Sequence, residues 1–356
     1  MSTETKLRRK RKKVQRKVES TQARLSRRLG KLRALESRIA RLQQQLVAEA
    51  DRRDPGDATT RQMRPVTLIF NPKCGGSARK DISLDEIVAQ LRRHGFEADV
   101  KIKTCGKDAR RWAKDAVAAS EDCVVVAAGD GTVGDVAAQL VGSKTVLGIL
   151  PVGTMNNLAR SLGIPLELDK ACALLAIGSK RSIDVGHILV DEKPQRTYFL
   201  ETAGLGVSAI AFPAGQAARK GQLHVLPRAI RKLFDHKPRP VQIVLDDGEP
   251  ILTQSQLVTV SNAPLMGLNF LVAPEAKMDD GLLDVAVYEG MGKTKLLEYF
   301  MATRDGKRVE NSSVRYYRAR KIHLISQSEQ PVHADKDDLA PQQVVDIEVI
   351  PQALSM

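Results

Sequence analysis

The stretch Cys123-Val-Val-Val-Ala-Ala-Gly-Asp-Gly-Thr132 joins a short apolar run to a loop rich in glycine. A second unit of the same kind follows, in which the run Thr145–Leu150 leads into Pro151-Val-Gly-Thr-Met-Asn-Asn157. Short aliphatic runs bounded by turn residues are typical of buried parallel strands. Because loops at the carboxyl ends of parallel strands converge on the ligand site, the two loops predict one shared site.

The chemistry of both loops favours phosphate. Glycine lets the backbone approach a phosphate closely, while amide N–H groups and threonine hydroxyls supply donors. Asp130 places a negative charge in the first loop, which fits a polyphosphate only if a divalent metal or an ordered network of donors intervenes. The pair of loops therefore predicts a nucleotide site of the kind found in kinases.

Elements of alternating type surround these loops. We expect strands at Val66–Phe70 and Ala98–Lys103 and helices at Leu84–His94 and Lys107–Ser120, which together indicate a parallel, doubly wound α/β sheet. After Ile164 the pattern changes to an antiparallel β-sandwich with two basic helical segments. The expected strands are Ser182–Val190, Arg196–Glu201, Val241–Leu245, Ile251–Ser261, Leu283–Tyr288, Arg320–Ser326 and Val344–Ile350, and the helical segments are Arg219–Arg239 and Lys293–Lys307.

Composition excludes several classes of protein. The 356 residues suffice for two domains, and no apolar run approaches the length of a membrane-spanning helix. The chain opens with charged residues, so we expect no secretory signal. Four scattered cysteines favour a reducing cytoplasm over a disulfide scaffold, and six scattered histidines argue against a zinc site.

The positive charge is concentrated at the N-terminus. Residues 1–53 hold 18 Lys and Arg against 5 Asp and Glu, so they account for nearly all of the net charge of +14. Between Val14 and Leu46 apolar residues recur at intervals of 3, 4 and 7, which indicates a long helix with one narrow apolar seam. A two-stranded coiled coil and a charged, partly disordered extension both remain open.

These patterns divide the chain into five segments. We predict a basic helical or coiled-coil extension at 1–53, a linker at 54–63 and an ATP-binding α/β domain at 64–164. A β-sandwich domain for lipid and metal follows at 165–340, and a C-terminal strand and tail occupy 341–356.

From about Arg64 to its end, the chain resembles the diacylglycerol kinase catalytic-domain family, the lipid kinases that include sphingosine kinases and soluble bacterial enzymes. Ala128–Val136 resembles the family pattern G-G-D-G-T-x-N-E-V, and Pro151–Arg160 resembles P-x-G-T-x-N-x-x-A-R. The resemblance implies a nucleotide domain like that of NAD kinase and 6-phosphofructokinase, a β-sandwich domain, and ATP in the cleft between them.

The resemblance also implies roles for individual residues. Asn71 and Gly75 would line one side of the nucleotide, Thr104 would make a further ATP contact, and Asn156 would brace the second loop. The residues that would hold the phosphates are Gly129, Asp130, Gly131, Thr132, Val133, Gly134, Asp135 and Thr154.

A Mg²⁺ ion is implied at the turn Ala276–Asp284, which matches the family segment D-D-G-x-[LF]. The Asp280 side chain and the carbonyls of Lys277 and Leu282 would hold it, and oxygen ligands on a sharp glycine turn suit a hard cation. An acidic surface turn without metal is the alternative. A separate Mg²⁺ should accompany the ATP.

The family motif D-G-E corresponds to Asp335-Lys336-Asp337, where the resemblance implies Asp337 as the general base toward the lipid hydroxyl and Asp335 as its partner. Three departures lie close to this chemistry. Gly134 and Asp135 replace Asn-Glu, and Lys336 replaces a glycine, a position that can require positive φ.

A lipid acceptor implies a cytoplasmic protein that binds the inner face of the membrane. Residues 6–17 suit anionic headgroups, and Lys220–Arg239 could enter the interface. We expect a homodimer through the N-terminal helix and no nucleic-acid partner. Two alternatives to an ATP-dependent lipid kinase stay open: a soluble-metabolite kinase resembling NAD kinase, and a weak or inactive kinase fold acting as a membrane adaptor.

Overall fold

The computed structural model describes residues 63–74, 82–190, 197–206, 238–267 and 269–356. The chain divides into two compact units, Met1–Gln62 and Met63–Met356, and the described residues belong to the second. Several predictions lie outside the described residues: the basic extension 1–53, nearly all of the linker 54–63, Gly75, and the basic segment Arg219–Arg239 up to residue 237.

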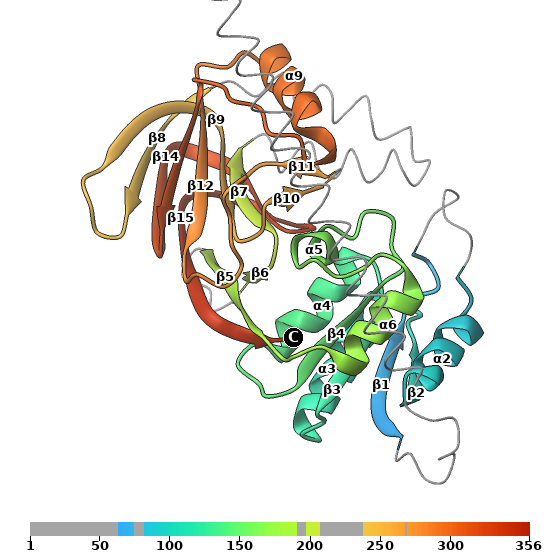
Figure 1. Cartoon of the computed structure of the whole chain (residues 1–356). Helices are drawn as coiled ribbons and strands as arrows, with labels where there is room; N and C mark the ends of the chain where they lie inside the picture. Colours follow the sequence, from blue (N-terminus) through green and yellow to red (C-terminus); the bar gives the residue numbers. More distant parts are fainter. Residues whose placement is uncertain (1–62, 75–81, 191–196, 207–237, 268) are drawn as a thin grey trace, which may run out of the picture. The chain divides into compact units, whose positions relative to one another are not determined.

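The first part of this unit is a parallel four-stranded sheet in the order β2-β1-β3-β4 (Figure 1). All three neighbouring pairs run parallel, as predicted from the alternation of elements. The strands are β1 (Arg64–Phe70), β2 (Phe96–Ile102), β3 (Cys123–Ala128) and β4 (Val146–Pro151).

Helices cover both faces of this sheet, which confirms the doubly wound arrangement. Along β3, Val124 and Val126 pack with α3 (Gly106–Ala118) and α4 (Asp130–Leu140), whereas Val125 and Ala127 pack on the opposite face with α2 (Leu84–Arg93) and α6 (Leu168–Ile177). Since successive side chains of a strand point to opposite faces, a strand buried on both sides reads as a continuous apolar run.

The strand order creates a switch point between β1 and β3. From β1 the chain moves outward to β2, and it then returns to the other side of β1 to form β3 and β4. Loops that leave two strands in opposite directions open a crevice at their carboxyl ends. Asn71 follows β1 and Gly129 follows β3, so the predicted loops flank this crevice.

The remaining strands form an antiparallel sheet in the order β13-β12-β9-β7-β14-β15-β5-β6, and β8 also pairs with β14 and β9. They enclose a second core that includes Phe199, Val260, Val285 and Ile347, which confirms the predicted β-sandwich. The strands are β5 (Ser182–Val190), β6 (Thr197–Phe199), β7 (Thr202–Gly206), β8 (Arg239–Leu245), β9 (Ile251–Ser261), β12 (Leu283–Glu289), β13 (Val314–Ala319), β14 (Lys321–Ala334) and β15 (Asp337–Ser355).

The C-terminal strand reaches the core of the α/β part. Leu354 of β15 and Ile183 of β5 belong to the same apolar cluster as α3 and α4. The backbones of Arg181 and Met356 exchange two hydrogen bonds of 2.8 and 2.7 Å. β15 thus connects the two parts of the unit. It also continues without a break across the segment boundary predicted between residues 340 and 341.

The structure also contains elements that the sequence did not predict. These are α6, β7, β13, the two-residue strands β10 (Leu265–Met266) and β11 (Phe270–Leu271), and the short helix η2 (Arg304–Gly306) after α9 (Lys293–Thr303). Register shifts between Ile325 and Val332 interrupt the alternation of β14, which explains why its second half escaped prediction. Arg239 was assigned to a helix but begins β8, because it pairs with Ser255 of β9.

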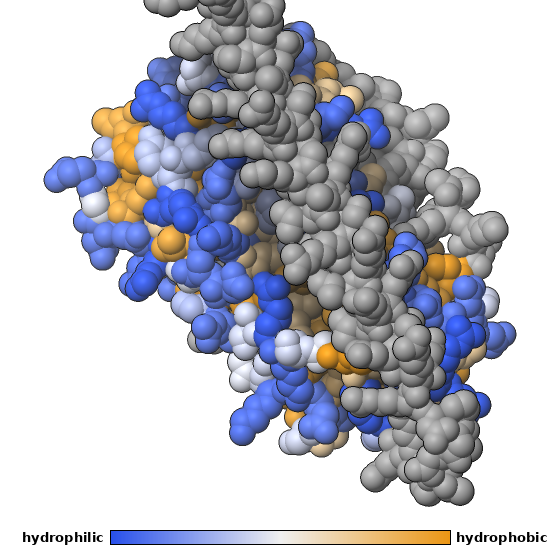
Figure 2. Space-filling model, viewed as in Figure 1, coloured by the Kyte–Doolittle hydropathy of each residue, from blue (hydrophilic) through white to orange (hydrophobic). Residues whose placement is uncertain are grey.

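The surface drawn in Figure 2 is mostly hydrophilic, with hydrophobic residues in small separate groups. Among the described residues, the exposed large apolar side chains are Ile102, Leu174, Ile177, Leu189, Leu252, Leu297, Met301, Tyr316 and Val344. No helix in the described ranges combines the length and apolar character that crossing a bilayer requires.

Candidate active site

The two glycine loops touch at Gly129 and Gly153. A Cβ atom added to Gly153 would lie 2.3 Å from the Cα of Gly129, and one added to Gly129 would lie 3.2 Å from the Cα of Gly153. Asn156 adopts a left-handed conformation (φ 53°), and its side-chain amide donates to the carbonyls of Pro151 and Gly153 at 3.0 Å each. The loops therefore form one compact floor, which Asn156 braces.

Asp130 joins this floor to the helix that follows the second loop, α5 (Asn157–Ser161). Its carboxylate accepts from the amide of Leu158 at 3.2 Å and also interacts with the amides of Asn157 and Asn156. Burial raises the pKa of Asp130, and these donors oppose that rise. An acid in this loop fits a phosphate site only if a divalent metal or an ordered network of donors intervenes, and the structure shows such a network of donors.

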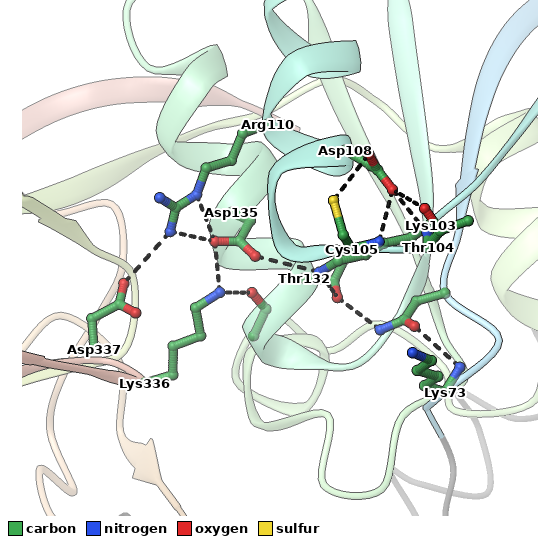
Figure 3. A network of polar contacts seen from close by, with 12 residues as sticks. Lys73, Lys103, Thr104, Cys105, Asp108, Arg110, Thr132, Asp135, Lys336 and Asp337 are labelled. Carbon is green, nitrogen blue, oxygen red and sulfur yellow. Dashed lines mark hydrogen bonds and ion pairs between the residues drawn. The ribbon is translucent and has the colours of Figure 1, made fainter.

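Lys103 meets Thr132 across the switch point (Figure 3), and Asn71 contacts the same hydroxyl. The side-chain amide of Asn71 donates to the Thr132 hydroxyl oxygen at 3.0 Å, and the Lys103 amine donates to the same oxygen at 3.1 Å. Thr132 is buried, and Cys74 donates its thiol hydrogen to the Asn71 carbonyl at 2.6 Å. The end of β1, the end of β2 and the start of α4 are thus held together by side chains.

Thr104 is exposed at the start of α3 and bonds to Asp108. Its hydroxyl donates to the Asp108 carboxylate at 2.7 Å, and the amides of Thr104 and Cys105 donate to the same oxygen at 2.9 and 2.8 Å. Hydrogen bonds from Cys105 and Thr104 hold the pKa of Asp108 well below its ordinary value. In this structure the Thr104 hydroxyl therefore helps to cap a helix.

Three cations surround Asp135, whose side chain is only 4% exposed. Its Oδ1 lies 2.6 Å from the Lys336 amine and 2.7 Å from the Arg110 guanidinium, and its Oδ2 lies 3.5 Å from Lys103 (Figure 3). Burial raises the pKa of Asp135, but bonds from Lys336 and Arg110 outweigh that effect and leave the pKa below its ordinary value. Asp135 is therefore ionised, and the neighbouring cations balance its negative charge.

The other residues predicted to contact the nucleotide differ in their surroundings. Val133 is buried in the core with α3, so its side chain points away from the crevice. A Cβ atom added to Gly134 would meet nothing within 4 Å, and Thr154 is exposed. Gly75 lies outside the described residues.

The hairpin between β14 and β15 brings Asp335, Lys336 and Asp337 to this crevice. Both carboxylate oxygens of Asp335 are engaged: Leu200 donates to one at 2.8 Å, and Glu201 and Thr202 donate to the other at 2.9 and 3.0 Å. Burial raises the pKa of Asp335 to about 6 despite these donors. Positive φ falls on Asp335 (48°), so Lys336 has an ordinary backbone conformation.

Asp337 differs from Asp335 in exposure and partner. It is exposed, and one oxygen lies 3.9 Å from the Arg110 guanidinium. Arg110 therefore contacts both Asp337 and Asp135, which lies on α4.

Glu201 is a site residue that the sequence did not reveal. Its carboxylate accepts from the Asn157 side chain at 3.1 Å, and the Asn157 amide also donates to the Gly267 carbonyl at 3.0 Å. Burial, followed by the charges of Asp130 and Asp335, raises the pKa of Glu201 well above its ordinary value. The only signal was a single acid inside an apolar run, which no motif marks. Arg110 and Lys103 also belong to no motif, so the sequence did not mark them as site residues.

An arginine of β13, Arg318, contacts the predicted Mg²⁺ turn. One oxygen of Asp280 accepts from the Leu282 amide at 3.1 Å, and the other contacts the Arg318 guanidinium, which also lies 3.6 Å from Asp284. Among the described residues no group of three or more His, Cys, Asp or Glu side chains could hold a metal ion. As arranged, Arg318 neutralises the Asp280 carboxylate, and the Mg²⁺ ligand set of Asp280 and the carbonyls of Lys277 and Leu282 stays a prediction.

Comparison with known proteins identifies the family. Residues 65–188 match the diacylglycerol kinase catalytic domain, and residues 202–356 match the YegS C-terminal NAD kinase beta sandwich-like domain. A diacylglycerol kinase from Mycobacterium tuberculosis (strain H37Rv) is 30% identical over 308 residues, which cover 85% of this chain and 97% of that protein. The chain belongs to the diacylglycerol kinase family.

Other members of the diacylglycerol kinase family agree. A diacylglycerol kinase from Bacillus subtilis (strain 168) is 28% identical over 272 residues, covering 74% of this chain and 86% of its own. The crystal structure of a putative diacylglycerol kinase from Bacillus anthracis superposes with a TM-score of 0.67 at 25% identity, over 83% of this chain and 98% of that one. The resemblance that the motifs carried is confirmed, and the chain is a kinase of this family.

Proposed function

We propose that this member of the diacylglycerol kinase family transfers the γ-phosphate of ATP to a hydroxyl group of diacylglycerol or a related lipid. One observation carries the proposal. The hairpin of Asp335–Asp337 reaches the phosphate loop, where Lys336 contacts Gly131 and Asp337 lies beside Arg110. A kinase needs phosphate-binding groups and a carboxylate that orients the acceptor hydroxyl within one site, and this arrangement supplies both.

The phosphates would lie over the floor formed by Gly129 and Gly153, at the N-terminus of α4. The N-terminus of a helix offers amide donors and a partial positive charge to an anion. Lys103 and Arg110 add cationic side chains from two other elements. A Mg²⁺ ion accompanying the ATP would supply further charge neutralisation when bound.

Asp337 is the better candidate for the general base. A base must have an oxygen available to the acceptor hydroxyl. Both oxygens of Asp335 accept hydrogen bonds from backbone amides of residues 200–202. Asp337 is exposed, and its ion pair among the described residues is the 3.9 Å contact with the Arg110 guanidinium. We therefore assign Asp335 to anchoring the hairpin and Asp337 to the acceptor.

The test is transfer of ³²P from labelled ATP to mixed lipid vesicles that contain diacylglycerol, with lipid and aqueous products separated. Asp337→Asn should lower transfer to lipid by about 100-fold or more, the usual contribution of a general base. Asp338→Asn is the matched control, since Asp338 is the neighbouring exposed acid on the same strand. It should retain transfer within about 3-fold.

Three other results would contradict the proposal. Labelled NADP formed from NAD, with no labelled lipid, would identify a soluble-metabolite kinase. No transfer to any acceptor would identify an inactive kinase fold that acts as an adaptor. Equal losses for Asp337→Asn and Asp338→Asn would remove Asp337 from the base role.

Membrane binding is a second part of the proposal. We propose that the protein binds the inner face of an anionic membrane through residues 6–17 and Lys220–Arg239. We also propose that it dimerises through its N-terminal helix. Apart from residue 238 and Arg239, these segments lie outside the described residues. Each Lys or Arg near an anionic surface contributes roughly 1 kcal/mol. Deletion of residues 1–53 should therefore weaken cosedimentation with anionic vesicles, and unchanged cosedimentation would exclude the extension from this role.

A further inference from the structure

Two departures from the family pattern touch each other in space. Asp135 on α4 replaces Glu, and Lys336 in the β14–β15 turn replaces Gly. The Lys336 amine lies 2.6 Å from Asp135 Oδ1, a distance typical of a strong charge-assisted hydrogen bond (Figure 3). The two replacements thus create one contact between the sandwich and the α/β part that the sequence pattern D-G-E cannot make.

Lys336 makes a second contact with the phosphate loop itself. Its amine donates to the Gly131 carbonyl at 2.6 Å. Its stem also lies along the loop, because a Cβ atom added to Gly131 would be 3.0 Å from the Lys336 Cδ. The side chain therefore contacts the loop through both its polar end and its apolar stem.

Asp135 does not depend on Lys336 for its charge balance. Arg110 lies 2.7 Å from one oxygen and Lys103 lies 3.5 Å from the other. If Lys336 were replaced by a neutral side chain, Asp135 would remain paired with two cations. The consequence would be felt at the hairpin, which would lose its attachment to the loop.

The hairpin is held on two sides, and Asp337 lies beyond both attachments. Asp335 attaches it to the sandwich through the backbone amides of residues 200–202. Lys336 attaches it to the phosphate loop through Gly131 and Asp135. The position of Asp337 relative to a phosphate on the loop therefore depends on the residue that precedes it.

We propose that Lys336 is a positioning residue, which fixes the carboxylate of Asp337 at the phosphate loop by binding Asp135 and Gly131. This role rests on the proposed function, because Asp337 needs a defined position only if it orients an acceptor. Displacement of a reacting group by about 1 Å can lower a rate by about 100-fold. The loss should appear in kcat, since the groups that hold ATP stay in place.

The test compares Lys336→Met, Asp135→Asn and the double variant D135N/K336M in the vesicle transfer assay. Met keeps most of the length of Lys without its charge. Lys336→Met should lower kcat by about 10- to 100-fold. Its KM for ATP, and its affinity for a non-hydrolysable ATP analogue by calorimetry, should stay within about 3-fold of wild type. Because the two residues act through one contact, the double variant should lose about as much as the worse single variant.

A second pair of variants restores the family pattern. Lys336→Gly alone should reduce kcat as Lys336→Met does, and D135E/K336G should recover part of that loss because the longer Glu occupies space that Lys336 fills. Lys107→Met is the matched control for loss of a cation, since Lys107 is exposed on the same helix as Arg110. It should leave kcat within about 3-fold.

The outcomes separate this inference from the proposed function. If wild type transfers no phosphate to lipid, the proposed function fails and the positioning role fails with it. If wild type is active and Lys336→Met keeps its kcat, or if the effects of Lys336→Met and Asp135→Asn multiply, the positioning role alone is wrong. A rise in KM for ATP with unchanged kcat would likewise overturn it, because Lys336 would then bind nucleotide.

Discussion

Gly153 lies so close to Gly129 that a Cβ atom on Gly153 would be 2.3 Å from the Cα of Gly129. No rotamer change relieves such an overlap, because the atom that it meets belongs to the backbone. The contact joins loops that follow two neighbouring strands, so the position of either loop depends on the other.

Gly153→Ala should therefore disrupt both loops, whereas Gly134→Ala should not. Forcing an extra methyl into a packed region costs about 1–3 kcal/mol, and the displaced loops should lose affinity for an ATP analogue. Gly134 lies inside α4 with open space around it, so Ala should stabilise the helix by up to about 1 kcal/mol. Urea unfolding and calorimetry measure the two effects, and equal destabilisation by both variants would contradict the assignment.

Asp130→Ala should uncouple the first loop from α5. The variant removes the acceptor for the Leu158 amide and leaves buried donors without a partner, whereas Asp130→Asn keeps one acceptor oxygen. We expect Ala to weaken binding of an ATP analogue by about 10-fold or more and Asn to weaken it less. Asp115→Ala, on the exposed side of α3, is the control. Full activity in Asp130→Ala would exclude a role in the phosphate site.

Stability should fall as the pH rises through the range in which Asp335 ionises. Burial raises the pKa of Asp335 from its ordinary 3.8 to about 6, so the folded protein binds a proton more tightly than the unfolded chain. The stabilising contribution is complete below about pH 4 and is lost as the pH approaches and passes 6. Glu201 and Asp130 shift in the same direction. Urea midpoints measured between pH 4 and 7 should decrease less steeply in Asp335→Asn, and an identical slope would contradict this origin.

Arg318→Ala should make the stability of the sandwich sensitive to Mg²⁺. Without the guanidinium, Asp280 and the largely buried Asp284 have lost their common counter-charge. Carboxylate and carbonyl oxygens then offer a hard cation an open position. In the absence of nucleotide, Mg²⁺ should raise the melting temperature of Arg318→Ala but hardly change that of wild type. Arg315→Ala is the control, because Arg315 lies on the same strand as Arg318 and pairs with Glu289 of β12, away from the turn. A wild-type protein that is stabilised by Mg²⁺ and weakened by EDTA would show that the turn binds metal despite Arg318.

Much of the fold could be predicted because its signals are local. β3 matches its predicted range Cys123–Ala128, and β9 matches Ile251–Ser261, since a buried strand shows as an apolar run between turn residues. α6 was missed because its residues after Lys170 are all apolar and show no helical periodicity. The second half of β14 and the first half of β15 contain polar residues and prolines, and their pairing with each other alone defines them.

In the candidate site, too, local motifs could be predicted, whereas contacts between distant residues could not. The glycine loops and Asp335-Lys336-Asp337 are contiguous motifs, so the sequence alone indicates them. Glu201 and Arg110 belong to no motif, and the structure alone places Glu201 beside Asn157 and Arg110 beside Asp135. Lys336 had been a departure that suggested backbone strain, yet positive φ falls on its neighbour Asp335.

By itself the sequence determined the parallel sheet, the sandwich, the two glycine loops and the family, because each is encoded in residues adjacent along the chain. Only the tertiary structure decided which charges meet. Lys336 and Gly131 are 205 residues apart, and their 2.6 Å contact depends on how β14 and β15 are placed against α4. A charge has no preferred partner in sequence, since its interaction depends on distance and burial after folding. The pairing of Lys336 with Asp135, and of Arg318 with Asp280, is for that reason a property of the folded protein.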